Sequence, residues 1–337
     1  LAIDCGSTTL AGALLDLDDG RCLAQAGRLN RQYGLAEDVV GRQRLAADPA
    51  SRRELCQLVR EALQALIDEL LSGVDGGNAL VEELVCCGNP TIIHLLLDQD
   101  PSGMGRTPFE PVELAPAARP AAALGLRLPC PVVLLPAPAC YLGGDIVAGL
   151  LAVAPATDAP QLIADLGTNC ELVLRWGGRS WGTAVPAGPA FEGAALRCGL
   201  GAVPGAIHAV EQTDDGRLQV ATLGGAAPLG WCGSGVLAWL ARAQAIGLVD
   251  QRGRLDATAA QVVELQLDGQ RHRVWQAAED VHLSEADIAE VLQAKAAVQA
   301  GIVGLCRVAG VDWRKLQLVL AGALVRHLQA TDLIRLG

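Results

Sequence analysis

Two short stretches decide the fold: Ile3-Asp-Cys-Gly-Ser-Thr-Thr9 and Ala164-Asp-Leu-Gly-Thr-Asn169. Each one ends an apolar strand with an aspartate, turns through a glycine and a hydroxyl residue, and leads into a second apolar strand. Glycine lets the main chain turn and approach a ligand closely, and serine or threonine adds a hydroxyl donor. Each stretch alone is also compatible with an ordinary tight turn. The matching pair favours two related phosphate-binding loops at the tips of two hairpins.

The segments around these loops alternate between strand-like and helix-like patterns, which predicts an α/β chain. The expected strands are 1–4, 10–16, 84–87, 161–165, 171–175 and 315–320. The expected helices are 51–71, 145–152 and a long one from a capping box at Ser284-Glu-Ala-Asp287 to about 309. Residues 101–138 are rich in proline and alanine and predict a long, mostly irregular segment.

The repeat of the loop pattern predicts two related domains, 1–155 and 156–337. A length of 337 residues also favours two domains, since one domain commonly has about 100–200 residues. The chain has no initiator methionine, and no closing helix is expected before Gly337. We therefore expect a fragment whose C-terminal end is truncated.

The composition excludes several classes of function. A formal net charge of -11 argues against a nucleic-acid partner. No uninterrupted apolar run reaches the roughly 20 residues of a membrane helix, so we expect no membrane partner. The 11 cysteines are odd in number and contain no C-x-x-C pair, which favours reduced thiols in a cytoplasmic protein. The five histidines show no metal spacing with one another and are expected to be structural.

The two loops predict a site for a magnesium-bound polyphosphate. A carboxylate at the end of each strand suits Mg²⁺, which proteins commonly hold through the waters of the metal. Asp4 and Asp165 are therefore the expected metal residues. The expected cofactor-binding residues of the loops are Asp4, Gly6, Ser7, Thr8, Thr9, Asp165, Gly167, Thr168 and Asn169.

The order of four segments resembles the ATPase superfamily of actin, sugar kinases and DnaK-type chaperones. Asp4–Thr9 resembles its first phosphate loop, Gly143–Gly149 its connecting helix, Asp165–Asn169 its second phosphate loop and Val319–Ala323 its adenosine strand and turn. The resemblance implies two actin-like (ribonuclease H-like) domains that flank a nucleotide cleft. It also implies ATP and Mg²⁺ as ligands, with Gly322 beneath the adenosine.

A more specific resemblance, in family order along almost the whole chain, is to the ATPase domain of the reductive activators of corrinoid proteins (RACo). The matching segments are Cys87-Gly-Asn-Pro-Thr91 with His94, Asp165-Leu-Gly-Thr-Asn-Cys-Glu171, Ala187-Gly-Pro-Ala-Phe-Glu-Gly193, Cys232-Gly-Ser-Gly235, Gln293-Ala-Lys295 and Leu320-Ala-Gly-Ala323. The resemblance implies slow ATP hydrolysis coupled to the reduction of a Co(II) corrinoid protein to Co(I). The implied partners are a corrinoid (iron–sulfur) protein and an electron-donor domain or ferredoxin. An iron–sulfur cluster is expected only in a domain absent from this chain, and a homodimer stays open.

Three residues are candidates for catalysis. Asp145 opens an apolar helix after two glycines, where it either orients water or magnesium near the γ-phosphate or only stabilises the helix dipole. Glu171 lies two residues beyond Asn169 on the same side of its strand, and it either approaches the metal or forms a cross-strand ion pair. Asn89 either reaches substrate or phosphate or is a plain turn residue.

Further cofactor-binding candidates have equally plain structural alternatives. Gly188 and Glu192 belong to the Ala187–Gly193 segment, where Glu192 either lines the cleft or caps a helix. Gly233 and Ser234 begin a helix whose N–H groups either receive phosphate or only start the helix. Lys295 either contacts the adenine or is a solvated helix lysine.

Three other functions stay open for such a chain. A small-molecule kinase on the same fold needs a second ligand pocket beside the γ-phosphate. An activator of a radical dehydratase holds a metal cluster between two subunits, which the missing C-x-x-C pair weakly disfavours. A nucleotide-sensing module binds ATP without hydrolysing it.

Overall fold

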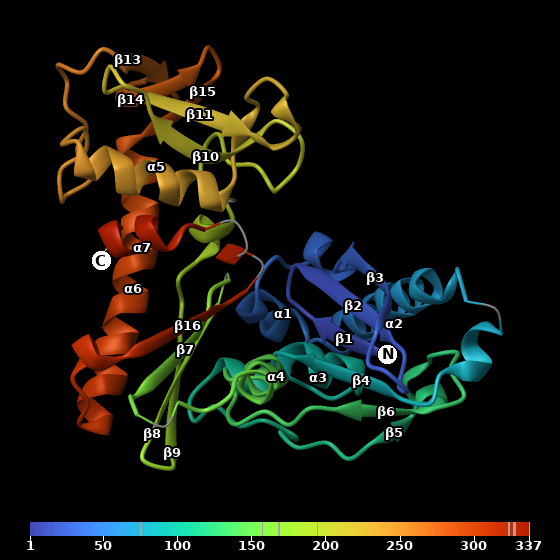
Figure 1. Ribbon diagram of the computed structural model, residues 1–337. Coiled ribbons are helices and arrows are strands. Elements are labelled where there is room, and N and C mark those ends of the chain that lie inside the picture. The colour runs from blue at the N-terminus through green and yellow to red at the C-terminus, as the bar shows by residue number, and fades with distance from the viewer. Residues whose placement is uncertain are drawn as a thin grey trace. The chain divides into compact units, whose positions relative to one another are not determined.

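The computed structural model describes residues 1–336, except 75, 157, 168, 194, 323, 326 and 327. The chain divides into two compact units, Leu1–Ala154 and Pro155–Gly337. Each unit is built around its own cluster of buried apolar side chains, which are mainly leucine, valine, isoleucine and alanine. The units are described one at a time below, with the labels of Figure 1.

A six-stranded sheet of order β3-β2-β1-β4-β6-β5 forms the centre of the first unit (Figure 1). Its strands are β1 Ala2–Cys5, β2 Thr9–Leu15, β3 Cys22–Leu29, β4 Leu84–Gly88, β5 Arg119–Pro120 and β6 Pro131–Leu134. β1, β2 and β3 form an antiparallel meander, whereas β4 lies parallel to β1 and β6 parallel to β4. The first loop, Asp4–Thr9, therefore connects the neighbouring strands β1 and β2, and the end of β4 lies beside it.

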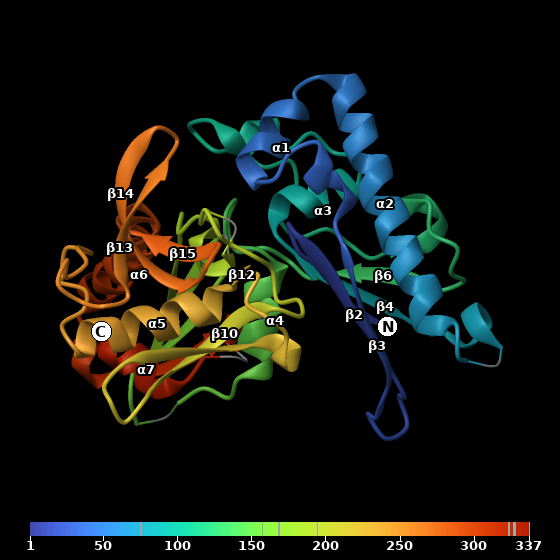
Figure 2. The ribbon, with the colours of Figure 1, turned by 90° about the horizontal axis from the view of Figure 1, so that it is seen from above.

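Four helices accompany this sheet: α1 Val39–Leu45, α2 Pro49–Leu71, α3 Pro90–Leu96 and α4 Gly144–Ala152. Asp48 caps α2 by accepting from the N–H of Ser51, and a proline occupies the first turn, where no backbone donor is lost. α2 runs along β2 and β3 (Figure 2). The packing is close, because a Cβ on Gly12 of β2 would lie 2.8 Å from the Leu70 side chain.

A four-stranded sheet of order β16-β7-β8-β9 organises one part of the second unit. Its strands are β7 Gln161–Asp165, β8 Cys170–Trp176, β9 Arg179–Val185 and β16 Gln317–Ala321. β7, β8 and β9 form an antiparallel meander, and β16 lies parallel to β7. The same arrangement occurs in the first unit, where β4 lies parallel to β1 beside the meander of β1, β2 and β3. The strands β7 and β8 thus correspond to β1 and β2, and the second loop, Asp165–Asn169, connects them.

The long helix α6, Glu285–Ala309, packs on β8 and β9. It begins with the expected capping box, in which Ser284 and Asp287 satisfy each other's backbone N–H groups. A Cβ on Gly301 would lie 2.6 Å from Leu172 and 2.7 Å from Val185, so glycine permits close contact between the helix and the sheet.

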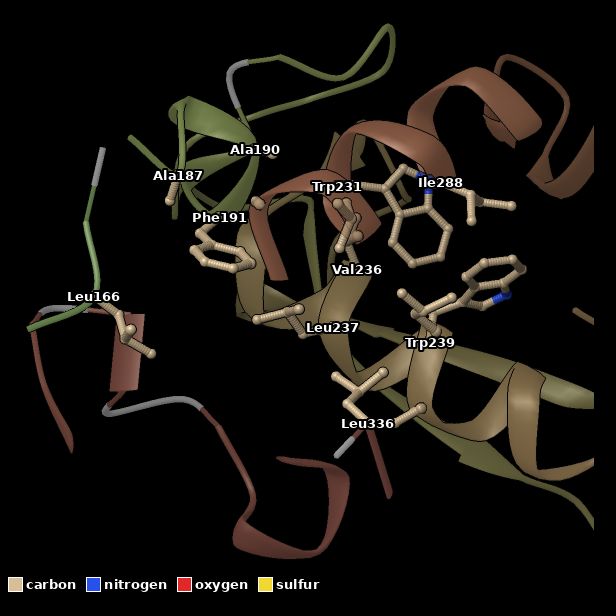
Figure 3. Packing of buried hydrophobic residues seen from close by; sticks show 14 of the residues in the cluster. Leu166, Ala187, Ala190, Phe191, Trp231, Val236, Leu237, Trp239, Ile288 and Leu336 are labelled. Carbon is tan, nitrogen blue, oxygen red and sulfur yellow. The ribbon is translucent and has the colours of Figure 1, made fainter. Parts of the chain in front are cut away.

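The rest of the second unit contains two three-stranded sheets, β11-β10-β12 and β13-β14-β15. Their strands are β10 Ala206–Gln212, β11 Leu218–Thr222, β12 Gly230–Trp231, β13 Val262–Leu267, β14 Gln270–Ala278 and β15 Val281–Ser284. Helix α5, Gly233–Ala245, packs on β10, and helix α7, Ala330–Leu336, packs on α5. Figure 3 shows part of the core between these elements, where the rings of Trp231 and Trp239 lie 6.3 Å apart.

The observed elements correct two sequence-based expectations. Residues 101–138 are not irregular throughout, because they include β5 and β6, and Val132 and Leu134 of β6 are buried in the sheet. A strand of four residues that begins with proline is too short to show a clear period of two. The chain also has a closing helix, α7, although none was expected.

Among the described residues, α6 is one helix whose length and mean hydropathy would suffice for a membrane span, although charged residues interrupt its apolar sequence. Its contacts are those of a helix in a folded domain. Ile288, Val291 and Leu305 are buried in the core of the second unit, and Leu292, Val298 and Ile302 pack against that core.

Candidate functional site

The first loop lies between β1 and β2 and is shaped by a glycine. A Cβ on Gly6 would lie 2.5 Å from the carbonyl oxygen of Thr9, so no other residue fits this turn. Asp4 ends β1 and pairs in register with Cys87 of β4. The Cys87 Sγ lies 3.7 Å from Asp4 Oδ1.

Asn89, directly after β4, joins the loop to the start of α3. Its Oδ1 accepts from the backbone N–H of Ile92 at 3.1 Å, which caps the helix. Its Nδ2 donates to Ser7 Oγ at 3.0 Å. The side chain is 8% exposed, so burial and two hydrogen bonds fix its orientation. Asn89 therefore contacts the first loop through the Ser7 hydroxyl, and its reach to substrate or phosphate stays a prediction.

Asp145 lies in the first turn of α4, and the two glycines before it allow that helix to begin against β4. A Cβ on Gly143 would lie 2.5 Å from the carbonyl oxygen of Gly88 and 2.7 Å from the Cα of Asn89. Asp145 Oδ1 accepts from the N–H of Ile146 at 2.8 Å. Burial raises the pKa of Asp145, and hydrogen bonds from the backbone only partly oppose this effect.

The surroundings of the Cys87 thiol show that the carboxylates of Asp4 and Asp145 lie close together. Burial raises the pKa of the Cys87 thiol, and the negative charges of Asp4 and Asp145 raise it further. Cys87 is therefore a protonated thiol flanked by two acids. The structure brings Asp4, Ser7, Asn89 and Asp145 together at the ends of β1 and β4 and the start of α4.

The second loop follows β7, and its neighbours are β8 and β16. Asp165 pairs in register with Glu171 of β8 and with Ala321 of β16. Side chains of paired residues lie on the same face of a sheet, so the carboxylates of Asp165 and Glu171 share one face. Glu171 is only 8% exposed.

Gly322 packs directly against the second loop. Its φ of +101° is in the region that favours glycine, and a Cβ there would lie 2.5 Å from Leu166 O and 2.9 Å from Asp165 Oδ1. The N–H of Leu166 donates to Ala321 O at 3.1 Å. Gly167 and Asn169 flank Thr168, which lies outside the described residues. The phosphate-binding role of all three stays a prediction.

The start of α5 is packed tightly inside the second unit. A Cβ on Gly233 would lie 1.6 Å from Phe191 O, which excludes any side chain at this position. Ser234 is 2% exposed, and its hydroxyl lies 3.2 Å from His208 O, to which it donates. The contacts described here are those of a helix start, and phosphate binding by Gly233 and Ser234 stays a prediction.

The remaining candidates lie elsewhere in the second unit. Gly188 has a φ of +74°, so it serves a turn after β9. Glu192 ends a short 3-10 helix, Pro189–Glu192, and its side chain lies outside the described residues. Lys295 is half-buried near the middle of α6. Their roles toward a nucleotide stay predictions.

The donors at the first loop suit magnesium and phosphate. Carboxylate, hydroxyl and amide oxygens are hard ligands, and Mg²⁺ usually keeps several waters while one or two carboxylates and the substrate phosphates hold it. Within the described ranges, no group of three or more His, Cys, Asp or Glu side chains is arranged to hold a metal alone. Asp4 therefore fits a magnesium ion that arrives with a polyphosphate.

Two residues that contact the first loop were missed by sequence reasoning. Asn30 follows β3, and Arg42 lies in α1; both are buried and both donate to carbonyl groups of the loop. Neither residue has a motif around it. Arg42 is one of several arginines in a polar stretch, so only the fold distinguishes it from its exposed neighbour Arg44.

Comparisons with known proteins agree with this geometry. Residues 159–337 match the family model of the C-terminal domain of RACo, described as the ASKHA (actin-like) domain, and residues 1–155 match that of the RACo middle region. The expected α/β class with an actin-like domain is thereby confirmed.

The proteins similar to the chain include two curated proteins and the solved structure of an activator. The corrinoid activation enzyme RamQ of Eubacterium limosum is 29% identical over 96% of this chain and 57% of its own length. The Co(II) methylated amine-specific corrinoid protein reductase of Methanosarcina barkeri is 26% identical over 62% of this chain and 40% of its own length. The structure of a reductive activator for a corrinoid, iron–sulfur protein is 31% identical with a TM-score of 0.86, over 99% of this chain and 55% of that one. The chain thus spans little more than half the length of RamQ and of the solved activator.

Proposed function

Because the chain belongs to the RACo family, we propose that it is the ATP-binding and slowly ATP-hydrolysing part of an activator of corrinoid proteins. The activator returns an inactive Co(II) corrinoid protein to Co(I). The observation that carries the proposal is the cluster of Asp4, Ser7, Asn89 and Asp145 in a chain whose relatives are named for corrinoid activation.

Each residue of the cluster has a role that its surroundings support. The first loop binds phosphate, and Asn89 orients the Ser7 hydroxyl by donating to its Oγ. Asp4 would hold a magnesium ion, which would neutralise phosphate charge when bound. Asp145, whose pKa burial raises, accepts a proton from the attacking water. In the second unit, Asp165, Glu171 and the second loop bind phosphate, and Gly322 and Lys295 contact the adenosine.

The free energy of ATP binding acts on the partner only through differential affinity. A nucleotide shifts a conformational equilibrium by as much as its affinities for the two states differ. We therefore assign ATP the role of selecting a conformation that binds the Co(II) form of the corrinoid protein. Electrons come from an iron–sulfur domain or a ferredoxin outside this chain, and the reaction takes place in the cytoplasm.

The test is ATP hydrolysis by the purified chain with and without a Co(II) corrinoid protein. We expect slow basal hydrolysis and a severalfold increase with the Co(II) form, but no increase with the Co(I) form. A rate that stays the same with either form contradicts a role in corrinoid activation. Transfer of the γ-phosphate to an added sugar or acid establishes a kinase instead, and tight ATP binding without hydrolysis establishes a sensing module.

A further inference from the structure

Three successive carbonyl groups of the first loop accept hydrogen bonds from two residues outside the loop. Asn30 Nδ2 donates to Gly6 O at 3.0 Å, and Arg42 Nη2 donates to Ser7 O at 2.6 Å. The backbone N–H of Asn30 donates to Thr8 O at 2.8 Å. Two residues thus hold three consecutive peptide units of the loop.

These hydrogen bonds determine where the N–H groups of the loop point. In a planar trans peptide, the N–H is directed opposite to the C=O of the same unit. The N–H groups of Ser7, Thr8 and Thr9 therefore each point away from the donor that holds the C=O of the same peptide unit. Successive N–H groups on one side of a loop form a concave site for an anion. The loop holds this arrangement through contacts within the protein.

Arg42 differs from an ordinary structural arginine. It is 0% exposed. Its Nε donates to Ala36 O at 3.0 Å, and its buried Nη1 finds no hydrogen-bond partner among the residues that the structure describes. Burial lowers the pKa of Arg42 to about 10, so the guanidinium is still positive at neutral pH. The negative charge of Asp38 opposes this shift only partly, and among the described residues no ion pair with Arg42 is formed, so carbonyl oxygens are its hydrogen-bond partners.

The elements around Arg42 hold the guanidinium in place. Asp38 caps the start of α1 by accepting from the N–H of Gly41 at 2.6 Å. The neighbouring Gln43 donates to Thr91 Oγ1 of α3 at 2.9 Å, and both residues are buried. Helix α1 is thus fixed to α3, the same helix that Asn89 caps. Arg42 and Asn89 reach the first loop from elements that are fixed to each other.

We propose that Arg42, together with Asn30, is a positioning residue of the first loop, which fixes the N–H groups toward a polyphosphate and places a permanent positive charge behind them. The hydrogen bond from a cation also polarises the Ser7–Thr8 peptide, which makes the Thr8 N–H a stronger donor. An anion bound at the front of the loop then offsets the cost of the buried guanidinium. The proposal rests on the proposed function only in that the first loop binds the phosphates of ATP.

The experiment compares Arg42→Met with Arg44→Met, an exposed arginine of the same helix, as the matched control. Isothermal titration measures the affinities of both variants and the parent for Mg·ATP, magnesium triphosphate and adenosine. We expect Arg42→Met to bind Mg·ATP and triphosphate about 10- to 100-fold more weakly, as befits loss of a charged hydrogen bond. Adenosine affinity stays the same, and Arg44→Met binds all three ligands like the parent.

Two further results separate this proposal from that of ATP-driven activation. If Arg42→Met keeps the parent's ratio of triphosphate to adenosine affinity, the positioning role of Arg42 is overturned, while the proposed function stands. If the parent binds triphosphate through Arg42 but neither binds adenosine nor hydrolyses ATP, the positioning role stands and the proposed function fails. Should circular dichroism show that Arg42→Met is unfolded, Arg42→Lys is judged by the same affinity ratio. Lysine keeps the charge but cannot make both contacts, so an unchanged ratio overturns the proposal.

Discussion

At the scale of single residues, burial decides the chemistry of Asp145. The residue is placed where a helix dipole favours a negative charge, yet removal from water has the larger effect, and its pKa is raised. A raised pKa makes a carboxylate a stronger base, which suits proton transfer from water.

Replacing Asp145 tests its role as a base. We expect Asp145→Asn to lower kcat for ATP hydrolysis about 100-fold or more, with the dissociation constant of Mg·ATP changed little. In the parent, kcat falls as the pH drops through the raised pKa of Asp145, because the protonated acid cannot accept a proton. Glu54→Gln, on the exposed face of α2, is the control. A kcat within threefold of the parent contradicts the assignment.

Gly322 tests the contact between β16 and the second loop. Gly322→Ala brings a Cβ to 2.5 Å from Leu166 O in a backbone conformation of positive φ. We expect a loss of about 1–3 kcal/mol in the free energy of unfolding and weaker Mg·ATP binding. Gly304→Ala in α6 is the matched control, since its Cβ meets nothing within 4 Å. Chemical denaturation and titration calorimetry measure both effects; equal behaviour of the two variants refutes the account.

At the scale of elements, His94 holds α3 against the segment that follows it. Its Nδ1 lies 2.7 Å from Pro90 O, and its Nε2 accepts from the N–H groups of Val112 and Glu113 at 3.1 and 3.3 Å. Only the neutral ring with the proton on Nδ1 satisfies all of these contacts. The expectation that His94 is structural agrees with this geometry.

The neutral ring of His94 predicts a pH dependence of stability. Burial lowers the pKa of His94 below its usual value, so the unfolded chain binds the proton more readily than the folded chain. Stability is therefore full above about pH 6.5 and decreases as the pH falls below it. Urea denaturation from pH 8 to pH 5 should show this decrease in the parent and a smaller one in His94→Gln. The same decrease in both proteins would exclude His94 as its source.

The closing helix α7 is attached to α5 by an ion pair. Asp332 is 2% exposed, and its Oδ1 lies 2.7 Å from Arg242 Nη1. Removing one partner leaves a buried charge, so we expect Asp332→Ala to lose about 3 kcal/mol of the free energy of unfolding. Arg335, at 3.9 Å from Asp332 and half exposed, is the control, and Arg335→Gln should change stability by less than about 0.5 kcal/mol. Thermal unfolding measures both; similar losses would show that the pair does not hold α7.

At the scale of the whole molecule, the parts of the fold with strong local sequence signals were the parts that could be predicted. The two hairpins, the glycine turns and the capped helix α6 each have strong local signals, because turns and caps depend on specific residue types. The short strand β6 and the helix α7 have weak ones and depend on tertiary packing. The strands β10 to β15 contain no motif that would have indicated two separate sheets.

The candidate site was predictable to the extent that it is local. Asp4, Ser7, Asn89 and Asp145 were found because each follows or precedes a glycine turn. Asn30 and Arg42 were not, because their contacts with the loop depend on how β3 and α1 return to it. Gly233 and Ser234, at the start of α5, show why a local motif can also mislead. A glycine-rich helix start predicts phosphate binding, but it also permits close packing inside a unit.

The prediction that decides most is that the second loop, Asp165–Asn169, is a phosphate loop that binds Mg·ATP, as the first loop is proposed to be. The direct test is a calorimetric titration of Mg·ATP into the parent and into Asp165→Ala, with Asp158→Ala as an exposed control in the same unit. The account predicts that Asp165→Ala binds Mg·ATP at least about tenfold more weakly and hydrolyses it more slowly, while the control equals the parent. If Asp165→Ala binds and hydrolyses Mg·ATP as well as the parent does, the second loop is not a phosphate loop and the claim is wrong.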